Sequence, residues 1–512
     1  MKKSYLLIAA LAIGTCASAQ KTTDPTKYAK LITAEDAKKH LSILASDEYE
    51  GRETGKPGAE KAANYIAAEF KRLGLQAPVD GSYFFNVPLT ENSMKISFSV
   101  NGQVAANGQD FFTRSNVADN SITANEIVFV GYGTEAELST TDIAGKVILL
   151  VNEDKPEAGK PTNTSYRATA ARNAILKNLQ SKSPALILAA NGEIADLMKR
   201  FGSSVTGARL TIKTGETKGA TQQTAVVHIT TALADQLVKS SGKSYADLKA
   251  TSAQTIKADV KADFHTEQKD VKAVDVLGYL PGTDLKDEVL VFSAHYDHIG
   301  LNPNGKDKVN NGADDDGSGT TGILEIARAF TRAKKDGHGP RRSILFLGNV
   351  GEEKGLLGSE YYTDHPVFPL ANTITDLNID MIGRVGEEYI GKADSANYVY
   401  TIGSAMLSKE LHQINEDANA KYTHLEQDYK YDDPKDPNRF YYRSDHYNFA
   451  KHGVPIIFYF NGVHADYHQP GDEVSKINFP LLAKRAQLVF YTGWELANRD
   501  KRPVVDAPAT GK

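Results

Sequence analysis

From residue 271 to residue 498, short apolar runs alternate with segments that repeat their apolar residues at helical spacing. Residues 323–330 show the helical pattern, with apolar side chains at positions i, i+3, i+4 and i+7. The strand-like runs lie at residues 289–292, 344–347, 377–379 and 456–460. Strands that alternate with helices along a chain usually form a parallel sheet covered by helices. We therefore predict an α/β fold with a mixed, largely parallel central sheet and helices on both of its faces.

Residues 86–270 have a different pattern, in which short β-branched segments such as 127–130 and 147–151 are separated by Gly, Asn, Asp and Ser. This pattern is typical of a β-rich domain. Upstream, two amphipathic segments that end near Leu44 and at Gly74 indicate a helical hairpin. A chain of 512 residues also exceeds what one hydrophobic core usually organises. We predict a discontinuous α/β domain at 20–85 and 271–499, an inserted β-rich domain at 86–270 and a flexible tail at 500–512.

Residues 1–19 have the layout of a cleavable export signal: two lysines, an apolar run at residues 5–13 and small residues up to Ala19. We expect the mature chain to begin at Gln20 and to be periplasmic or extracellular. Cys16, the only cysteine, offers an alternative, because a lipid anchor would attach to a cysteine at the cleavage point. Thr15 fits that alternative poorly. If Cys16 is removed with the signal, any metal must be bound by His, Asp and Glu.

The composition argues against two classes of partner. The chain has 59 Lys and Arg residues and 64 Asp and Glu residues, a net charge of −5 with no basic stripe, which argues against nucleic acid. No segment after the signal offers ~20 uninterrupted apolar residues, so we expect no permanent membrane span.

Candidate metal ligands follow the strand-like runs at the points where the runs end. In α/β proteins this edge of the sheet lines the binding crevice. Each candidate has an ordinary explanation by itself, because Asp-rich turns cap helices, Glu pairs occupy solvated helix faces and single histidines form hydrogen bonds in loops. Together, the order His, Asp, Glu, Asp, His supplies two metal ions with nitrogen and oxygen ligands and one shared carboxylate. The candidates are His295, Asp297, Glu352, Glu353, Asp380 and His468, with three adjacent carboxylates at residues 314–316.

These motifs resemble those of the co-catalytic zinc aminopeptidases related to bacterial leucyl aminopeptidase. The resemblance covers about residues 33–85 and 271–499 and implies the zinc-exopeptidase type of α/β fold. Residues 86–270 resemble the protease-associated domain that many of these enzymes carry as an insertion. The matching blocks are residues 295–297, 312–315, 351–356, 378–381 and 467–468.

The resemblance implies a site for two zinc ions that share one ligand, Asp315. Asp297 would orient a histidine ligand as a hydrogen-bonded carboxylate. Some members have Asn on both sides of the shared Asp, whereas this chain has Asp314 and Asp316, so these two carboxylates remain alternatives for the shared ligand. The remaining ligands that the resemblance implies are His295 and Asp380 for one ion, and Glu353 and His468 for the other.

The resemblance also implies a mechanism for peptide-bond hydrolysis. Two zinc ions lower the pKa of a bridging water and polarise the scissile carbonyl. Glu352 acts as the general base that takes the proton of this water and passes it to the leaving amine. Tyr467 resembles the family tyrosine that stabilises the oxyanion. The turn at residues 443–446 places Arg443 near the substrate or, equally, in a structural salt bridge.

The balance of charges near the motifs predicts which end of a peptide is recognised. An aminopeptidase holds a cationic α-amino group and needs carboxylates, whereas a carboxypeptidase holds a carboxylate and needs arginines. Carboxylates outnumber the arginines beside the motifs, Arg384 and Arg443. We therefore expect peptide substrates with free amino termini.

Other functions use the same fold. A carboxypeptidase and a glutaminyl cyclase are the enzymatic alternatives, and the cyclase would bind one metal rather than two. A third alternative is a binding ectodomain without catalytic activity. Its signature would be missing metal ligands or a missing general base. The acidic stretch at residues 428–433 is either an exposed loop or a calcium site near Asp432.

Overall fold

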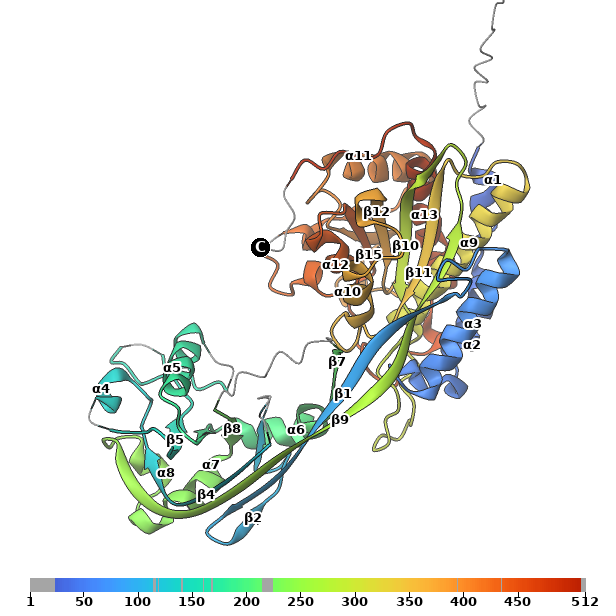
Figure 1. The fold of residues 1–512 in the computed structure, drawn as a ribbon. Helices are drawn as coiled ribbons and strands as arrows, with labels where there is room; N and C mark the ends of the chain where they lie inside the picture. Colours follow the sequence, from blue (N-terminus) through green and yellow to red (C-terminus); the bar gives the residue numbers. More distant parts are fainter. Residues whose placement is uncertain are drawn as a thin grey trace, which may run out of the picture. The chain divides into compact units, whose positions relative to one another are not determined.

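The computed structural model describes residues 24–507, apart from residues 114–116, 118, 140, 160, 167–168, 214–223, 394 and 434. The chain divides into two compact units (Figure 1): unit 1 contains Met1–Phe85 and Val274–Lys512, and unit 2 contains Asn86–Ala273. The predicted export signal, including Cys16, lies outside the described residues, as does the end of the predicted tail. The two stretches of unit 1 are therefore separated in the chain by all of unit 2.

A mixed sheet forms the centre of unit 1, in the strand order β14-β13-β15-β12-β10-β11-β9. Strand β10 is parallel to β11 and β12, and β12 is parallel to β15, whereas β9 and β13 join antiparallel to β11 and β15. This arrangement confirms the predicted fold class. The strands are β9 (Gln254–Leu280), β10 (Leu285–His295), β11 (Arg342–Asn349), β12 (Thr373–Ile379), β13 (Tyr398–Ile402), β14 (Glu426–Asp428) and β15 (Ile456–Phe460).

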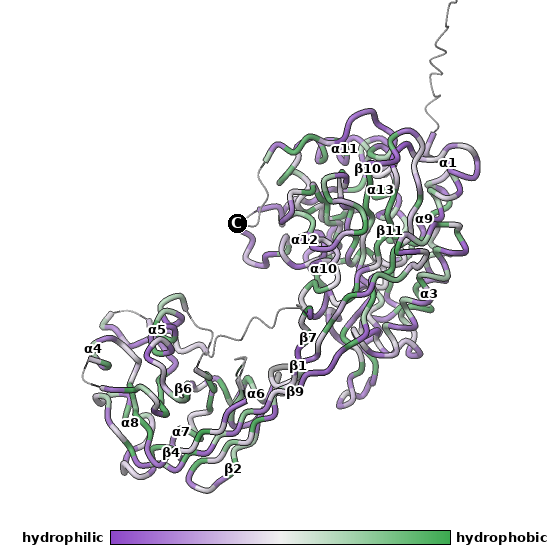
Figure 2. Tube along the Cα trace, in the orientation of Figure 1, coloured by the Kyte–Doolittle hydropathy of each residue, from purple (hydrophilic) through white to green (hydrophobic). Residues whose placement is uncertain are grey.

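The parallel strands bring their carboxyl ends to one edge of the sheet. His295 of β10 lies opposite Asn349 of β11, and Ile379 of β12 lies opposite Tyr459 of β15. Strands β11, β12 and β15 are buried along their whole length, as expected for parallel strands covered on both faces. Figure 2 shows the hydrophobic residues of unit 1 concentrated in its central strands and helices. The loops that follow these strand ends carry the candidate ligands.

Capping residues mark the start of helix α2 and the end of helix α3 in unit 1. The Thr33 hydroxyl accepts the N–H of Asp36 (3.1 Å) at the start of α2, and Gly74 ends α3 with φ 86°. No helix in the described part of the chain is long and apolar enough to cross a membrane. The helices are α1 (Thr26–Ala29), α2 (Ala34–Leu44), α3 (Pro57–Leu73), α9 (Gly319–Lys335), α10 (Leu357–Asp364), α11 (Lys409–Ala418), α12 (His446–Lys451) and α13 (Phe479–Asn498).

The last helix of unit 1 packs against its first elements and against the sheet. The Gln487 side chain donates to the carbonyl of Ile32 (3.0 Å), and the rings of Tyr28 and Trp494 stack with centroids 5.7 Å apart. A Cβ at Gly493 would lie 2.3 Å from the ring of Phe292, so only glycine lets α13 approach β10 this closely. Both ends of the chain of unit 1 therefore contribute to one core.

Unit 2 combines parallel strands with helices, in the strand order β9-β4-β5-β6-β8-β3. Strands β4, β5, β6 and β8 are parallel, and the helices that connect them are an addition to the β-rich pattern expected from the sequence. Helix α5 was not predicted from the sequence, because its apolar stripe is short: Leu179 is buried in the core, and Ile175 and Leu176 pack against it. The elements are β1 (Phe84–Val100), β2 (Gln103–Ala105), β3 (Phe111–Thr113), β4 (Asn120–Phe129), α4 (Glu135–Leu138), β5 (Val147–Val151), α5 (Ala170–Ser181), β6 (Leu186–Ala190), α6 (Ile194–Thr206), β7 (Arg209–Ile212), β8 (Val226–Ile229), α7 (Thr231–Val238) and α8 (Tyr245–Leu248).

Candidate metal centre

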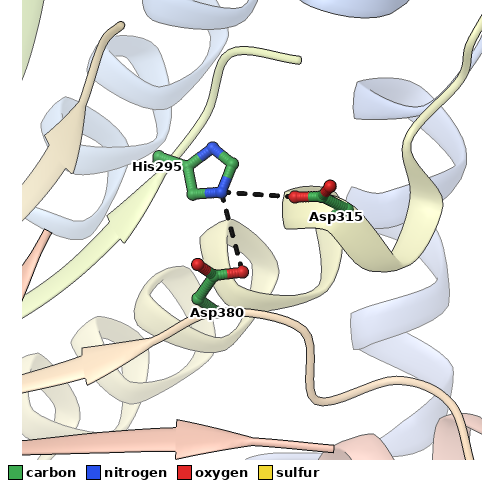
Figure 3. A group of neighbouring side chains, drawn as sticks. All are labelled: His295, Asp315 and Asp380. Carbon is green, nitrogen blue, oxygen red and sulfur yellow. Dashed lines mark ion pairs between the residues drawn. The ribbon is translucent and has the colours of Figure 1, made fainter. Parts of the chain in front are cut away.

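Two groups of possible metal donors meet at the carboxyl edge of the sheet in unit 1. The first is His295, Asp315 and Asp380, whose donor atoms all lie within 4.8 Å of one another. Figure 3 shows His295 Nε2 facing both carboxylates, 3.3 Å from Asp315 Oδ1 and 3.6 Å from Asp380 Oδ1. The three come from the end of β10, the turn before α9 and the end of β12.

The second group is His298, Asp315 and Glu353, so Asp315 belongs to both. His298 Nδ1 lies 2.8 Å from Glu353 Oε1. His468 lies in the same place, with Nε2 3.1 Å from Asp315 Oδ2 and 3.1 Å from Glu353 Oε2. The structure therefore brings together all five residues considered as ligands and adds His298.

Sequence reasoning did not single out His298, although it is fully buried and the His468 side chain is 36% exposed. The available signal was a second histidine three residues after His295. That signal did not show which way His298 points, because the chain leaves the regular strand after His295.

The three adjacent aspartates contact different partners. Asp314 Oδ1 accepts the N–H of Gly383 (2.6 Å). Asp316 Oδ1 accepts the N–H groups of Gly319 (2.8 Å) and Met381 (3.0 Å). Asp315 alone of the three belongs to the donor groups, while its neighbours bind backbone near Asp380 and at the start of α9.

Asp297 contacts both a ligand candidate and the candidate base. Its backbone carbonyl lies 3.0 Å from His295 Nδ1, closer than its carboxylate, which is 3.7 Å away. The carboxylate accepts the Thr54 hydroxyl (2.6 Å) and the N–H of Glu352 (3.2 Å). A carbonyl acceptor at Nδ1 fixes the ring so that Nε2 faces the site.

Buried Arg52 connects the ends of the segments that hold the donors. It donates to the carbonyls of Tyr296 (2.7 Å), Asn311 (2.7 Å) and Gly312 (2.8 Å). Sequence reasoning did not single out Arg52, which lies between the two segments of the predicted helical hairpin. Arg52 joins the end of β10 to the turn that carries Asp315.

The charges at the centre are unbalanced in a way that a cation would correct. Burial opposes the charged form of His295, but the nearby Glu352 and Asp380 outweigh it and raise the pKa of His295 well above its usual range. Burial would raise the pKa of Asp315, but contacts with His295 and His468 hold it well below its usual range. Within the described residues, His295 Nε2, His298 Nε2 and Asp315 Oδ2 are buried with no hydrogen-bond partner. These nitrogen and oxygen atoms fit a divalent metal, which would take the place of a proton on His295.

A cavity of about 30 Å³ opens beside the donors. Arg443 Nη2 lies 3.3 Å from the Tyr467 hydroxyl, and its guanidinium lies over the ring of Phe440, 4.8 Å from the centroid. Both residues singled out near the substrate therefore line the same cavity. The lining residues are Asp315, Glu352, Asp380, Met381, Phe440, Arg443, Phe458, Phe460, Val463 and Tyr467.

The acidic stretch at residues 428–433 binds protein groups. Asp428 accepts the Tyr389 hydroxyl (2.8 Å) and the N–H of Lys430 (2.9 Å), and Asp432 accepts the N–H of Gly403. The metal-donor groups found among the described residues lie elsewhere, at the carboxyl edge of the sheet.

Residues 275–493 match the family model described as Peptidase family M28. The matched residues make up 219 of the 512 residues of the chain. The match confirms the predicted resemblance to the co-catalytic zinc aminopeptidases.

Proteins named as aminopeptidases are similar to parts of this chain. The chain is 27% identical over 242 residues to aminopeptidase YwaD of Bacillus subtilis, which covers 45% of this chain and 46% of that protein. It is 26% identical over 300 residues to leucine aminopeptidase 2 of Trichophyton equinum, which covers 54% of each chain. The chain spans about half the length of the curated relatives it matches.

Solved structures share the fold over most of the chain. The aminopeptidase from Aneurinibacillus sp. strain AM-1 has a TM-score of 0.58 at 19% identity, covering 95% of this chain and 99% of that one. BSAP, a zinc aminopeptidase from Bacillus subtilis, has a TM-score of 0.53 at 21% identity, covering 93% and 97%. At these identities the likeness shows the fold of the chain alone.

Proposed function

We propose that this chain is an aminopeptidase that requires two zinc ions and hydrolyses the amino-terminal peptide bond of its substrates. The observation that carries the proposal is the position of Asp315 in two donor groups at once, with Glu352 lining the adjacent cavity. The M28 match and the relatives named as aminopeptidases support the same activity.

His295, Asp315 and Asp380 would hold one zinc ion, and Asp315, Glu353 and His468 would hold the other. When bound, the two ions supply an acidified water and a Lewis acid for the scissile carbonyl. His298 has its Nδ1 on Glu353 Oε1, so it would fix the rotation of that carboxylate and leave Oε2 facing His468 and the ion.

Glu352 would act as the general base. Burial, with the charges of Glu353 and Asp380, raises the pKa of Glu352 well above its usual range, although His295 opposes the shift. A base of raised pKa accepts a proton from the attacking water and returns it to the leaving amine. Tyr467 and Arg443, on the cavity wall, would bind the carbonyl oxygen or the chain of the peptide beyond it.

The charges of the centre favour a free amino terminus. Glu352 and Asp380 line the cavity and offer acceptors to a cationic α-amino group, whereas Arg443 is the one arginine of that lining. The apolar wall, with Met381, Phe458 and Phe460, would contact the side chain of the terminal residue. A carboxypeptidase would use Arg443 to bind a carboxylate and is therefore the alternative that the test must separate.

The test combines metal content with a panel of one peptide in three forms. We expect elemental analysis to find two zinc ions per chain, chelation to abolish cleavage and added zinc to restore it. A free amino terminus should be required, so acetylating it should block cleavage, while amidating the carboxyl end should matter little. Cleavage of the acetylated peptide at the normal rate would contradict the assignment, and a requirement for a free carboxylate would point to Arg443. A single zinc ion per chain would favour the cyclase.

We also propose that the chain is exported and that unit 2 is a protease-associated type of insertion. The order of charged, apolar and small residues at positions 1–19 supports the first. Unit 2 contains none of the proposed ligands, so it would control access to the centre or bind partners.

A further inference from the structure

Asp472 is a fully buried carboxylate that sequence reasoning did not select. It lies four residues after His468, and its Oδ2 accepts the N–H groups of Asp314 (2.9 Å) and Asp315 (3.0 Å). Its backbone carbonyl also accepts the N–H of Ala313 (3.0 Å). One residue thus receives hydrogen bonds from three consecutive amides of the turn that carries the shared donor.

The second oxygen of Asp472 faces two cationic groups. Oδ1 lies 3.6 Å from Arg384 Nη1 and 4.0 Å from His464 Nε2. Arg384 lies four residues after Asp380, and its Nη2 binds Asp466 (2.9 Å). Asp472 therefore contacts groups from the segments that follow β12 and β15 as well as the turn before α9.

The contacts of Asp472 limit the movement of Asp315, the residue proposed to bind both zinc ions. Asp315 offers Oδ1 toward His295 and Oδ2 toward His468. A small rotation of its backbone would carry both oxygens away from their partners. Hydrogen bonds to a buried carboxylate are short and directional, so the Asp472 side chain restricts that rotation.

The geometry points to Asp472 as a positioning residue that holds Asp315 in register with His468 and so sets the affinity for the zinc ion on the His468 side. This inference rests on the proposed zinc site. The effect on zinc affinity comes from the position of the acceptor Oδ2 and not from the negative charge of Asp472. Oδ2 is the atom that accepts the two amide hydrogens of the turn.

The test measures zinc affinity on the full chain by competition with a chromogenic chelator, with zinc alone as the probe. Asp472→Ala removes the acceptor and should weaken the more weakly held zinc by roughly 10–100-fold, the usual effect of losing a partner that orients a ligand. Asp472→Asn keeps an oxygen that can accept both amides and should stay within about threefold of the unmodified chain. Asp466→Asn is the matched control: Asp466 lies in the same segment, but its carboxylate accepts hydrogen bonds from Arg384 and Lys476 rather than from the amides that Asp472 binds. It should leave the affinity unchanged.

Turnover gives a second readout that a general loss of folding would not reproduce. In Asp472→Ala, kcat at low zinc should fall with metal occupancy and recover at saturating zinc, while KM stays unchanged. If the alanine variant does not fold, Asp472→Glu replaces it, because glutamate keeps the charge and moves the acceptor by one methylene. The inference then requires Asp472→Glu to bind zinc more weakly than Asp472→Asn.

Three outcomes would overturn the inference. They are normal affinity in Asp472→Ala, equal losses in Asp472→Asn and Asp472→Ala, or tighter binding in Asp472→Glu than in Asp472→Asn. The first would leave Asp315 positioned by other contacts, and the others would assign the effect to charge. If the unmodified chain binds no zinc, the proposed function itself fails.

Discussion

Two adjacent glutamates, Glu352 and Glu353, lie in opposite electrostatic environments. Burial and neighbouring carboxylates raise the pKa of Glu352. Burial and Asp315 act in the same direction on Glu353, but contacts with His298 and His468 outweigh them and lower its pKa. When the environments of two similar groups shift their pKa values in opposite directions, one group can act in acid–base catalysis and the other as a metal ligand.

Glu352→Gln should therefore slow turnover without releasing metal. The substitution keeps the size of the side chain and removes a proton acceptor that is not a proposed ligand, so kcat should fall by at least roughly 10²-fold. Zinc content should stay at two ions per chain. Glu360→Gln, in α10, is the matched control and should keep normal kcat, because Glu360 binds Lys451 at the surface. Near-normal turnover in Glu352→Gln would place the base elsewhere.

The types and order of the donors could be predicted from the sequence, because each follows a strand-like run and a parallel sheet gathers strand ends at one edge. The contacts that position them could not. His298 and Asp472 lie in irregular segments, and their directions depend on loops that pack only when the whole sheet is formed. The sequence also left Asp314, Asp315 and Asp316 as alternatives for the shared donor. In the structure the carboxylates of Asp314 and Asp316 accept backbone N–H groups, whereas Asp315 lies in both donor groups.

At the scale of elements, short segments after the strands contain left-handed backbone conformations that could not be predicted from the sequence. Met381 follows the end of β12 with φ 60°, and His468 has φ 55°. Left-handed backbone at residues other than glycine is costly and is found where surrounding contacts enforce it. Helices α2, α3 and α9 followed from apolar spacing, and the end of α3 followed from Gly74, whereas these turns depend on tertiary hydrogen bonds such as that from Met381 N–H to Asp316.

The short helical turn that ends at Asp432 makes a prediction about pH. Burial raises the pKa of Asp432 to about 6, against the N–H of Gly403, which lowers it. Because the folded pKa lies above the unfolded value, the stabilisation from this group is fully present below about pH 4 and is lost as the pH rises through 6. Asp432→Asn should remove this loss, so the variant should gain up to about 3 kcal/mol relative to the unmodified chain between pH 4 and pH 8.

Urea unfolding at several pH values, followed by the fluorescence of the single tryptophan, Trp494, measures this difference. Exposed Asp433 provides the control, and Asp433→Asn should follow the unmodified chain at every pH. A constant difference between Asp432→Asn and the unmodified chain from pH 4 to pH 8 would show that Asp432 does not titrate in this range.

At the scale of the molecule, unit 2 should be dispensable for assembling the metal centre. The proposed ligands all lie in unit 1. The cut ends would also be neighbours there, because the N–H of Leu277 donates to the carbonyl of Tyr83 (2.8 Å). Replacing residues 86–273 by a short Gly/Ser linker should therefore give a folded product that binds two zinc ions and cleaves small aminoacyl amides within about tenfold of the normal rate.

Zinc content, circular dichroism and turnover of the deletion product test this prediction, and a product that also lacks the proposed base through Glu352→Gln gives the inactive baseline. A soluble, folded product without zinc would show that unit 2 is part of the centre. Normal cleavage of amides with reduced cleavage of long peptides would assign unit 2 a role in substrate access.

The packing of α13 against Tyr28 and Ile32 has a consequence for how the chain is made. Residues 24–85 leave the ribosome long before Phe479, and at about 5–20 residues per second the 394 residues from position 86 to position 479 take roughly 20–80 s to synthesise. During that interval α2 lacks the helix that packs against it, whereas unit 2 is continuous in sequence and can complete its strands as they emerge. Nascent unit 1 therefore exposes the apolar face of α2 for tens of seconds, so a chaperone that binds exposed apolar segments would have time to bind there.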